Sequence, residues 1–140
     1  MRRALQVLAV LFAVWLTVAV ALFVVHHDDP PAHADAVVVL QGSKTRLPLG
    51  YQLVQDGYAP LLIVSRGSGL PLERRLCDEK TRLDVVTSQF HVFRARRIFE
   101  RCFDGDLRMV GSGQTWWLIP KYMATESAKL AYQTAFARGC

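Results

Sequence analysis

The sequence predicts an α/β domain built on a parallel sheet and preceded by one transmembrane helix. Three observations support this prediction. The first residues form one long apolar segment. Short apolar runs without alternation then follow, as is typical of parallel strands buried on both faces. Finally, these runs alternate with stretches of helical periodicity, a rhythm typical of βαβ units.

The N-terminal segment is apolar at all but two positions of Ala4–Val25. At about 1.5 Å per residue this segment spans about 33 Å, which is enough to cross a hydrocarbon core of about 30 Å. Arg2 and Arg3 precede it, so the positive-inside rule keeps the N-terminus cytoplasmic. We therefore expect a single-pass protein of the cell membrane whose domain lies outside the cytoplasm.

A cleaved signal peptide is the alternative, because Ala32-His33-Ala34 has the small-x-small form of a cleavage site. The apolar segment exceeds the usual signal-peptide core of about 7–15 residues, which favours a retained anchor. Both alternatives place the domain outside the cytoplasm. We expect an anchor at 1–27, a solvated linker at 28–34 and one domain at 35–140. The linker histidines and aspartates show no spacing that would fix a metal ion, and we predict no metal site.

The domain has ordinary globular composition and little excess charge. The chain carries a net charge of +5, and Arg2 and Arg3 account for two of those charges. Charge therefore gives little support to nucleic-acid binding. The three cysteines include no CxxC pair. In an oxidising compartment Cys77 and Cys102 can form a disulfide, leaving Cys140 free.

The predicted elements follow one another with short connections. Gly57 is placed to end the first helix of the domain, because glycine is favoured just past a helix C-terminus. Tryptophans at 116 and 117 more often close a core or lie at a membrane interface than stack on a substrate. We predict strands at 37–40, 61–64, 83–86 and 107–110, and helices at 47–54, 71–80, 90–101 and 124–138.

Polar residues follow three of the predicted strands, and the carboxyl ends of parallel strands are where ligands bind in open sheets. Glycine turns there expose backbone N–H groups that suit an anion, and nearby arginines add charge. Neither glycine turn matches a dinucleotide or P-loop motif, and the sequence indicates no particular cofactor. The candidate phosphate-binding residues are Gly42, Ser43, Arg46, Ser65, Gly67 and Arg94.

His91 and Ser88 are the candidate catalytic residues. His91 lies at the predicted start of a helix, with Arg94 on the same face one turn later. The helix dipole would lower the pKa of His91 and favour the neutral imidazole. A neutral histidine can move a proton, while arginine can hold a phosphate or carboxylate.

The domain resembles the envelope proteins SanA, ElyC and YdcF. The resemblance rests on Asp35–Gly42, on Arg46-Leu47 with Gly57–Pro60, on Leu62–Gly67 and, most specifically, on Val86–Ala95; Trp117–Tyr132 is also similar. It implies a Rossmann-like three-layer domain, linked to peptidoglycan-precursor or lipid-carrier metabolism. The family's glycine loop, first arginine, second loop, histidine and second arginine match Gly42, Arg46, Ser65 with Gly67, His91 and Arg94.

Two departures from that family bear on function. Its first loop usually reads GGG or GGS, where this chain has Gln41-Gly42-Ser43. The family also carries an extra helix and strand with a glutamate and a Ser-x-Asn-Thr motif, whereas this sequence contains no asparagine. The domain is therefore expected to be reduced. It either binds and hydrolyses or transfers a phosphate-bearing envelope precursor, or is a non-catalytic binding or regulatory module.

Overall fold

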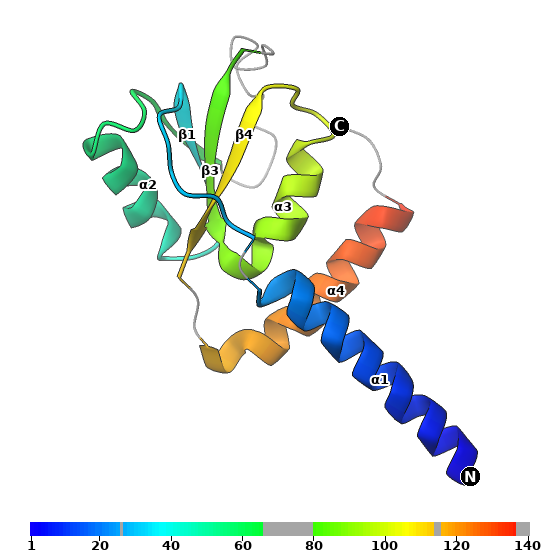
Figure 1. Cartoon of the computed structure of the whole chain (residues 1–140). Coiled ribbons are helices and arrows are strands. Elements are labelled where there is room, and N and C mark those ends of the chain that lie inside the picture. The colour runs from blue at the N-terminus through cyan, green and yellow to red at the C-terminus, as the bar shows by residue number, and fades with distance from the viewer. Residues whose placement is uncertain (26, 66–79, 114–115, 137–140) are drawn as a thin grey trace.

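The computed structural model describes residues 1–25, 27–65, 80–113 and 116–136. The predicted helix at 71–80 falls outside these ranges except for its last residue. Helices and strands alternate along the described chain, except that β3 follows β2 (Figure 1). Their order is α1 (Arg2–Phe23), β1 (Ala36–Leu40), α2 (Arg46–Gln55), β2 (Leu62–Ser65), β3 (Arg82–Ser88), the 3-10 turn η2 (Gln89–His91), α3 (Val92–Phe99), β4 (Asp106–Ser112), the 3-10 turn η3 (Trp116–Leu118) and α4 (Ile119–Ala135).

The four strands form one parallel sheet in the order β2-β1-β3-β4. In the register, Val38 lies between Ile63 and Val85, and Val86 pairs with Val110. The sheet confirms the predicted α/β class. Because the chain adds β2 on one side of β1 and then β3 on the other, the carboxyl ends of β1 and β3 form a topological switch point. Ligands bind at such points in open α/β sheets.

Helices cover both faces of the sheet, and alternate residues of each strand face them. One core cluster joins Val38, Leu83 and Val85 to Val92 of α3. The other joins Val37 and Val39 to Leu53 of α2 and to Val86 and Val110. Figure 1 shows α2 and α3 on opposite sides of the strands. This arrangement explains why the strands read as continuous β-branched runs.

Helix α2 approaches β1 very closely at Gly50. A Cβ atom built on Gly50 would lie 2.2 Å from Cγ2 of Val39. No side chain fits there unless the two elements move apart, since a packed core does not absorb such an overlap without strain. Gly50 thus sets the distance between α2 and the sheet, and with it the position of Arg46, which begins the helix about one turn earlier.

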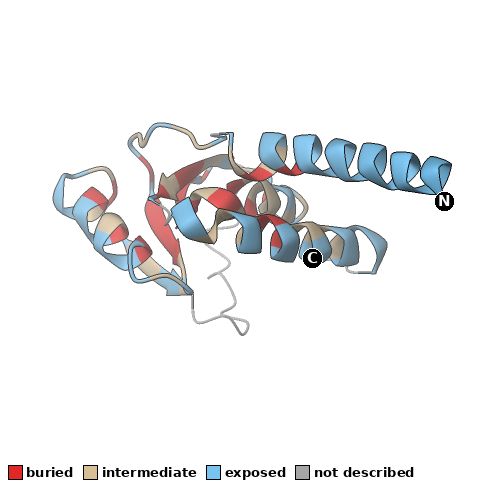
Figure 2. Ribbon diagram, turned by 90° about the horizontal axis from the view of Figure 1, so that it is seen from below, coloured by how far each residue is buried: buried red, intermediate tan, exposed pale blue. Residues whose placement is uncertain are grey.

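Helix α1 is the one described helix that is long and apolar enough to cross a membrane, with a mean hydropathy of 2.5. Most of it projects from the domain with its side chains exposed (Figure 2). Its last turns are buried at Ala19 and Phe23, which pack on Phe90 and Met123 in a third apolar cluster. The candidate span is therefore attached directly to η2 and α4.

The linker is held on the sheet, which corrects the prediction of a solvated linker. Oδ2 of Asp29 accepts hydrogen bonds from Nη2 of Arg96, at 2.6 Å, and from the backbone N–H of Met109, at 2.8 Å. The Asp29 N–H in turn donates to the Met109 carbonyl at 2.7 Å. Farther along, the Ala32 N–H donates to the buried carboxyl of Asp84 at 3.3 Å. Burial raises the pKa of Asp84 above its ordinary value.

Candidate functional site

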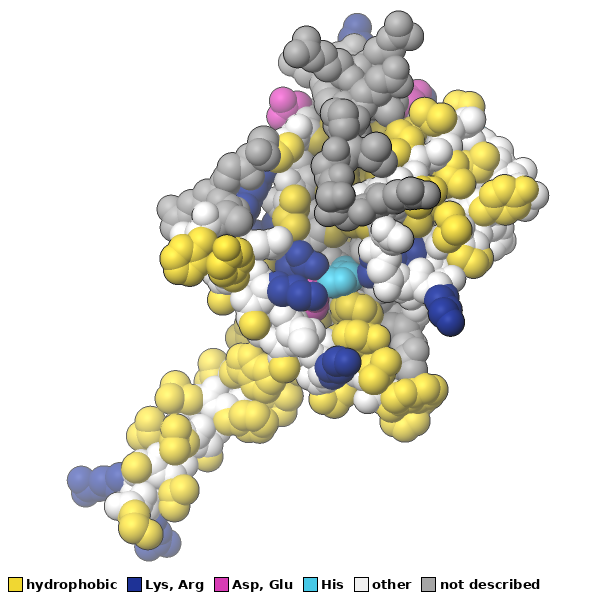
Figure 3. Space-filling model, turned by 180° about the vertical axis from the view of Figure 1, so that it is seen from behind, with side chains coloured by type: hydrophobic (Ala, Val, Ile, Leu, Met, Phe, Trp, Pro, Cys, Tyr) yellow, Lys and Arg dark blue, Asp and Glu magenta, His cyan; other side chains and the backbone are white. Residues whose placement is uncertain are grey.

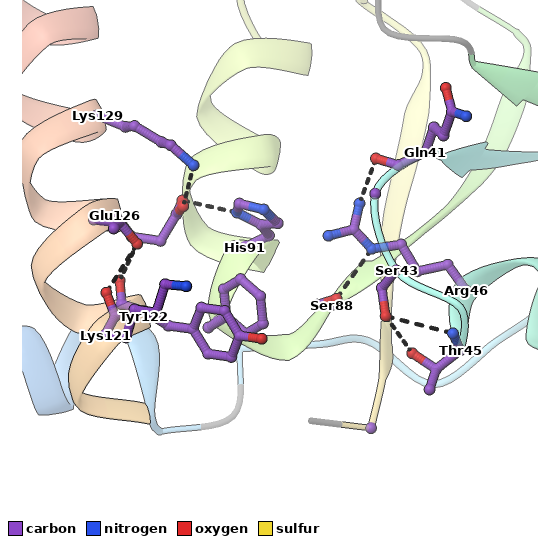
Figure 4. A pocket seen from close by; sticks show the side chains of 14 residues that line it. Gln41, Ser43, Thr45, Arg46, Ser88, His91, Lys121, Tyr122, Glu126 and Lys129 are labelled. Atoms are coloured by element: carbon purple, nitrogen blue, oxygen red, sulfur yellow. Dashed lines mark hydrogen bonds and ion pairs between the residues drawn. The ribbon is translucent and has the colours of Figure 1, made fainter. Parts of the chain in front are cut away.

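A cavity of about 440 Å³ lies between the carboxyl edge of the sheet and α4 (Figure 4). Its walls are the loop from Gln41 to Arg46, the turn from Ser88 to His91, and the side of α4 from Lys121 to Lys129. The first two walls follow β1 and β3, so the cavity occupies the switch point of the sheet.

Arg46 joins the ends of β1 and β3. It is 4% exposed, and its Nε donates to Oγ of Ser88 at 3.0 Å. Its Nη1 donates to the carbonyls of Leu40 at 2.9 Å and Gln41 at 3.0 Å. Burial lowers the pKa of Arg46, but a guanidinium stays charged in any protein. Figure 4 shows the remaining end of the guanidinium pointing across the cavity toward His91, where it can meet a ligand.

The glycine turn after β1 is shaped around the same guanidinium. Gly42 has φ +136°, and a Cβ there would lie 3.4 Å from Nη1 of Arg46. Only glycine adopts this backbone without strain. Next to it, Oγ of Ser43 forms a 2.9 Å hydrogen bond with the hydroxyl of Thr45. The turn therefore presents its backbone and two hydroxyl groups to the cavity, as a polar ligand requires.

Glu126 is a buried carboxylate at the centre of a cationic group. It is 0% exposed, and its Oε2 accepts hydrogen bonds from Nδ1 of His91 at 2.7 Å and from Nε of Arg94 at 2.6 Å. Its Oε1 accepts from Nζ of Lys129 at 3.1 Å. Burial alone raises the pKa of Glu126, but the hydrogen bonds from His91 and Arg94 outweigh it and lower the pKa from 4.5 to about 2. Glu126 is therefore ionised at neutral pH.

The ionised carboxylate determines which nitrogen of His91 carries the proton. Because a carboxylate can only accept, Nδ1 must be the N–H donor, and the 3.2 Å approach of Arg94 Nη2 to it is a contact between two donors. Burial lowers the pKa of His91 below 6.5, although Glu126 opposes this. This direction agrees with the prediction, and its largest cause is burial. The neutral ring keeps a lone pair on Nε2, and no described residue forms a hydrogen bond with that atom.

Positive charge exceeds negative charge around this histidine. Arg46, Lys121 and Lys129 line the cavity with Glu126 as the one acidic side chain among the described lining residues. Seen from behind the view of Figure 1, lysine and arginine side chains gather beside a histidine on the hollowed face (Figure 3). Such a cavity favours an anion, because cationic groups at its walls attract one from solution.

A second hollow of about 250 Å³ lies on the other side of His91, along α3. It shares His91 and Arg46 with the first cavity, and its remaining wall includes Arg94 together with Ile98 and Phe99. Thr87 at its base is fully buried, and its Oγ1 has no hydrogen-bond partner among the described residues. A buried hydroxyl of this kind usually has a hydrogen-bond partner, and its full burial keeps it out of reach of a ligand in the hollow.

No protein family model, no curated protein and no solved structure matches this chain. The geometry must therefore carry the functional argument.

The structure brings most of the predicted site residues together. Gly42, Ser43, Arg46, Ser88 and His91 line the main cavity. Arg94 lines the second hollow and contacts the carboxylate. Ser65 ends β2 beside Leu40 and is not among the residues that line either hollow. Gly67 lies outside the described residues, and so does Cys77; Cys102 is disulfide-bonded.

Sequence reasoning missed Glu126 as a site residue, together with Lys121 and Lys129. A signal for Glu126 was present, because it falls on the apolar face of α4 between Met123 and Leu130, one turn from each. A lone acidic residue on a core-facing stripe is expected to have a buried cationic partner. The partner itself could not be read from the sequence, since His91 lies 35 residues away.

Proposed function

We propose that this chain is a membrane-anchored protein of the SanA, ElyC and YdcF type, with a reduced Rossmann-like domain outside the cytoplasm that binds a phosphate-bearing ligand. Two observations support the location. The apolar helix α1 follows Arg2 and Arg3, which favours a cytoplasmic N-terminus. Cys102 is disulfide-bonded, as is usual for proteins of oxidising compartments.

The neutral His91, held by Glu126 inside a cationic cavity, is the observation that carries the functional proposal. In this role Arg46, Lys121 and Lys129 hold the phosphate, together with the backbone of the turn at Gly42. Ser88 and Arg94 are positioning residues, because Ser88 accepts from Arg46 and Arg94 donates to Glu126. Ser88, which the sequence suggested as catalytic, is only 1% exposed and has its hydroxyl engaged.

The chemistry that fits this arrangement is hydrolysis or transfer of a phosphoryl group. Nε2 of His91 takes the proton of the attacking water or hydroxyl group. The oxygen of that water or hydroxyl group bonds to phosphorus, and the bond from phosphorus to the leaving oxygen breaks. Glu126 stabilises the imidazolium that results, and the cations stabilise the charge on the phosphoryl oxygens. His91 then returns the proton to the leaving group.

The test is phosphate release from a lipid-linked pyrophosphate by the full chain in detergent. We expect His91→Ala to lower the rate by about 10² to 10⁴, the usual contribution of general acid–base catalysis. His33→Ala is the matched control. His33 lies in the linker, where its ring contacts Tyr58, and it is not among the residues that line the cavity. Equal rates for wild type and His91→Ala would remove His91 from the mechanism.

A non-catalytic binding module is the second candidate. The sequence lacks the family's Ser-x-Asn-Thr segment, which favours it. Thermal stabilisation of the full chain by inorganic pyrophosphate, without any phosphate release, would support this function. Because a ligand that binds only the folded state raises its stability, Lys129→Gln should reduce that stabilisation in either case.

A further inference from the structure

The outer side of α4 is uncharged and flanked by exposed aromatic residues. Trp116 and Trp117 just before the helix are 73% and 65% exposed, and Tyr132 and Phe136 at its other end are 63% and 76% exposed. Between them, one strip of exposed uncharged residues recurs every three or four positions along the helix, beside the exposed Lys121, Thr125 and Lys129 that line the cavity. The strip comprises Pro120, Ala124, Ala128, Ala131 and Ala135, of which the last two also line the groove between α4 and α1.

This face does not resemble an ordinary solvated helix surface. Surface helices normally place charged residues opposite their core-facing stripe. Here the core-facing stripe carries Met123 and the buried Glu126, while the two lysines of α4 lie toward the cavity. A contiguous exposed apolar surface with aromatic residues indicates a contact with a membrane or with another molecule. Of the two predicted alternatives for Trp116 and Trp117, their exposure excludes closure of a core and leaves a membrane interface.

The position of α1 favours a membrane as the partner of this surface. Ala19 and Phe23 pack against Met123 in one cluster, and a groove between the helices runs from Trp15 to Phe23 on α1 and from Ser127 to Ala135 on α4. Figures 1 and 2 both show α4 lying at the domain end of α1, and in Figure 1 it crosses that helix. If α1 spans a bilayer, its last turn reaches the membrane surface, and α4 lies at the same level.

We propose that the outer face of α4, with Trp116 and Trp117, lies in the headgroup region of the bilayer as a second membrane contact. This proposal rests on α1 being a membrane anchor, as proposed above. Tryptophan and tyrosine concentrate at this depth because their rings are apolar with one polar atom. Lys121 and Lys129 then lie between the lipid phosphates and the cavity, so the cavity opens at the height of lipid headgroups. A ligand with a lipid tail reaches it without leaving the membrane.

The experiment uses the full chain carrying Trp15→Phe, reconstituted in phosphatidylcholine vesicles. This substitution leaves Trp116 and Trp117 as the fluorescent tryptophans, since the sequence has three. We expect a blue-shifted emission, quenched by lipid spin-labelled near the headgroup more than by lipid labelled at the chain end, and shielded from acrylamide. Emission quenched freely by acrylamide and unaffected by labelled lipid would overturn the proposal.

A variant pair keeps the test specific. Ala128→Glu adds charge to the outer face of α4 and should shift the emission toward that of water-exposed tryptophan. Gln52→Glu adds the same charge to exposed surface on α2 and should leave the emission unchanged. Shielding from both acrylamide and labelled lipid would contradict the proposal and assign the face to a protein partner. Extraction of the whole chain by alkaline carbonate would refute the anchor itself, whereas retention with water-exposed tryptophans refutes only the contact of α4.

Discussion

Replacing Glu126 by glutamine tests the central feature of the site. The substitution keeps the shape of the side chain but removes the charge that His91, Arg94 and Lys129 share. Hydrogen bonds to a charged group contribute about 1.5–3 kcal/mol each, against about 1 kcal/mol for neutral pairs, so two weakened bonds cost about 1–4 kcal/mol. Lys129 is 54% exposed and adds little to this.

The pKa of Glu126, lowered by the same hydrogen bonds, gives a consistent magnitude. A pKa lowered from 4.5 to about 2 corresponds to about 3 kcal/mol of stability for the ionised form. This stability is fully present above pH 4.5, because the carboxyl is then ionised in both the folded and unfolded chains. It is lost as the pH falls toward 2, since the unfolded chain binds the proton first.

The assay is urea unfolding of the full chain in detergent micelles, followed by near-UV circular dichroism. We expect Glu126→Gln to unfold with about 3 kcal/mol less free energy than wild type at pH 7, and with a much smaller deficit near pH 2.5. Glu100→Gln is the matched control, because Glu100 is exposed and should change stability by no more than about 0.5 kcal/mol. A deficit of Glu126→Gln below about 0.5 kcal/mol, or one that does not change with pH, would refute the reasoning.

Three further predictions concern other parts of the fold. Gly50→Ala should lower the unfolding free energy by about 1–3 kcal/mol, because the added Cβ would overlap Val39. Gly113→Ala is the control and should be nearly neutral, because a Cβ there has no atom within 4 Å. Equal urea midpoints for the two variants would contradict this prediction. In NMR titration of the full chain, His91 should show a pKa below 6.5. Glu126→Gln should lower the pKa of His91 further, because the carboxylate of Glu126 raises it. A higher His91 pKa in the variant would be inconsistent with the pairing of His91 and Glu126. Asp29→Ala should lower the unfolding free energy by about 1–2 kcal/mol, because two hydrogen bonds are lost. Asp104→Ala is the control, because Asp104 is exposed. Indistinguishable thermal melts of the two variants would argue against a fixed linker.

Most of the sheet could be predicted from local sequence, because buried parallel strands are apolar without interruption. The boundaries differ where polar residues continue a strand: β3 extends through Thr87 and Ser88, since these pair with Gly111 and Ser112 of β4. The last helix begins at Ile119, five residues before the predicted start. Pro120 in its first turn is a standard start signal that the prediction did not use.

For the site, the sequence could predict only which residues lie at the carboxyl ends of the strands. Sequence placed His91 and Arg46 at the carboxyl edge because parallel strands end there together. It could not show that Arg46 bonds Ser88, or that α4 returns to place Glu126 against His91, because those contacts join residues 42 and 35 positions apart. Long-range pairing depends on how the last helix packs, and no local periodicity encodes that.

The hydrogen bonds of Asp29 also have a consequence for how the protein meets its ligand. Phe23 is packed on α4 and Asp29 is bonded to β4, and at about 3.5 Å per residue the chain between them reaches about 20 Å at most. Such a short connection, fixed at both ends, prevents the domain from tumbling on its anchor. If α1 spans the membrane as proposed, the cavity keeps one height and one orientation above the bilayer. Encounter with the proposed lipid-borne ligand would then be a search within a plane, in which lateral diffusion replaces diffusion through solvent.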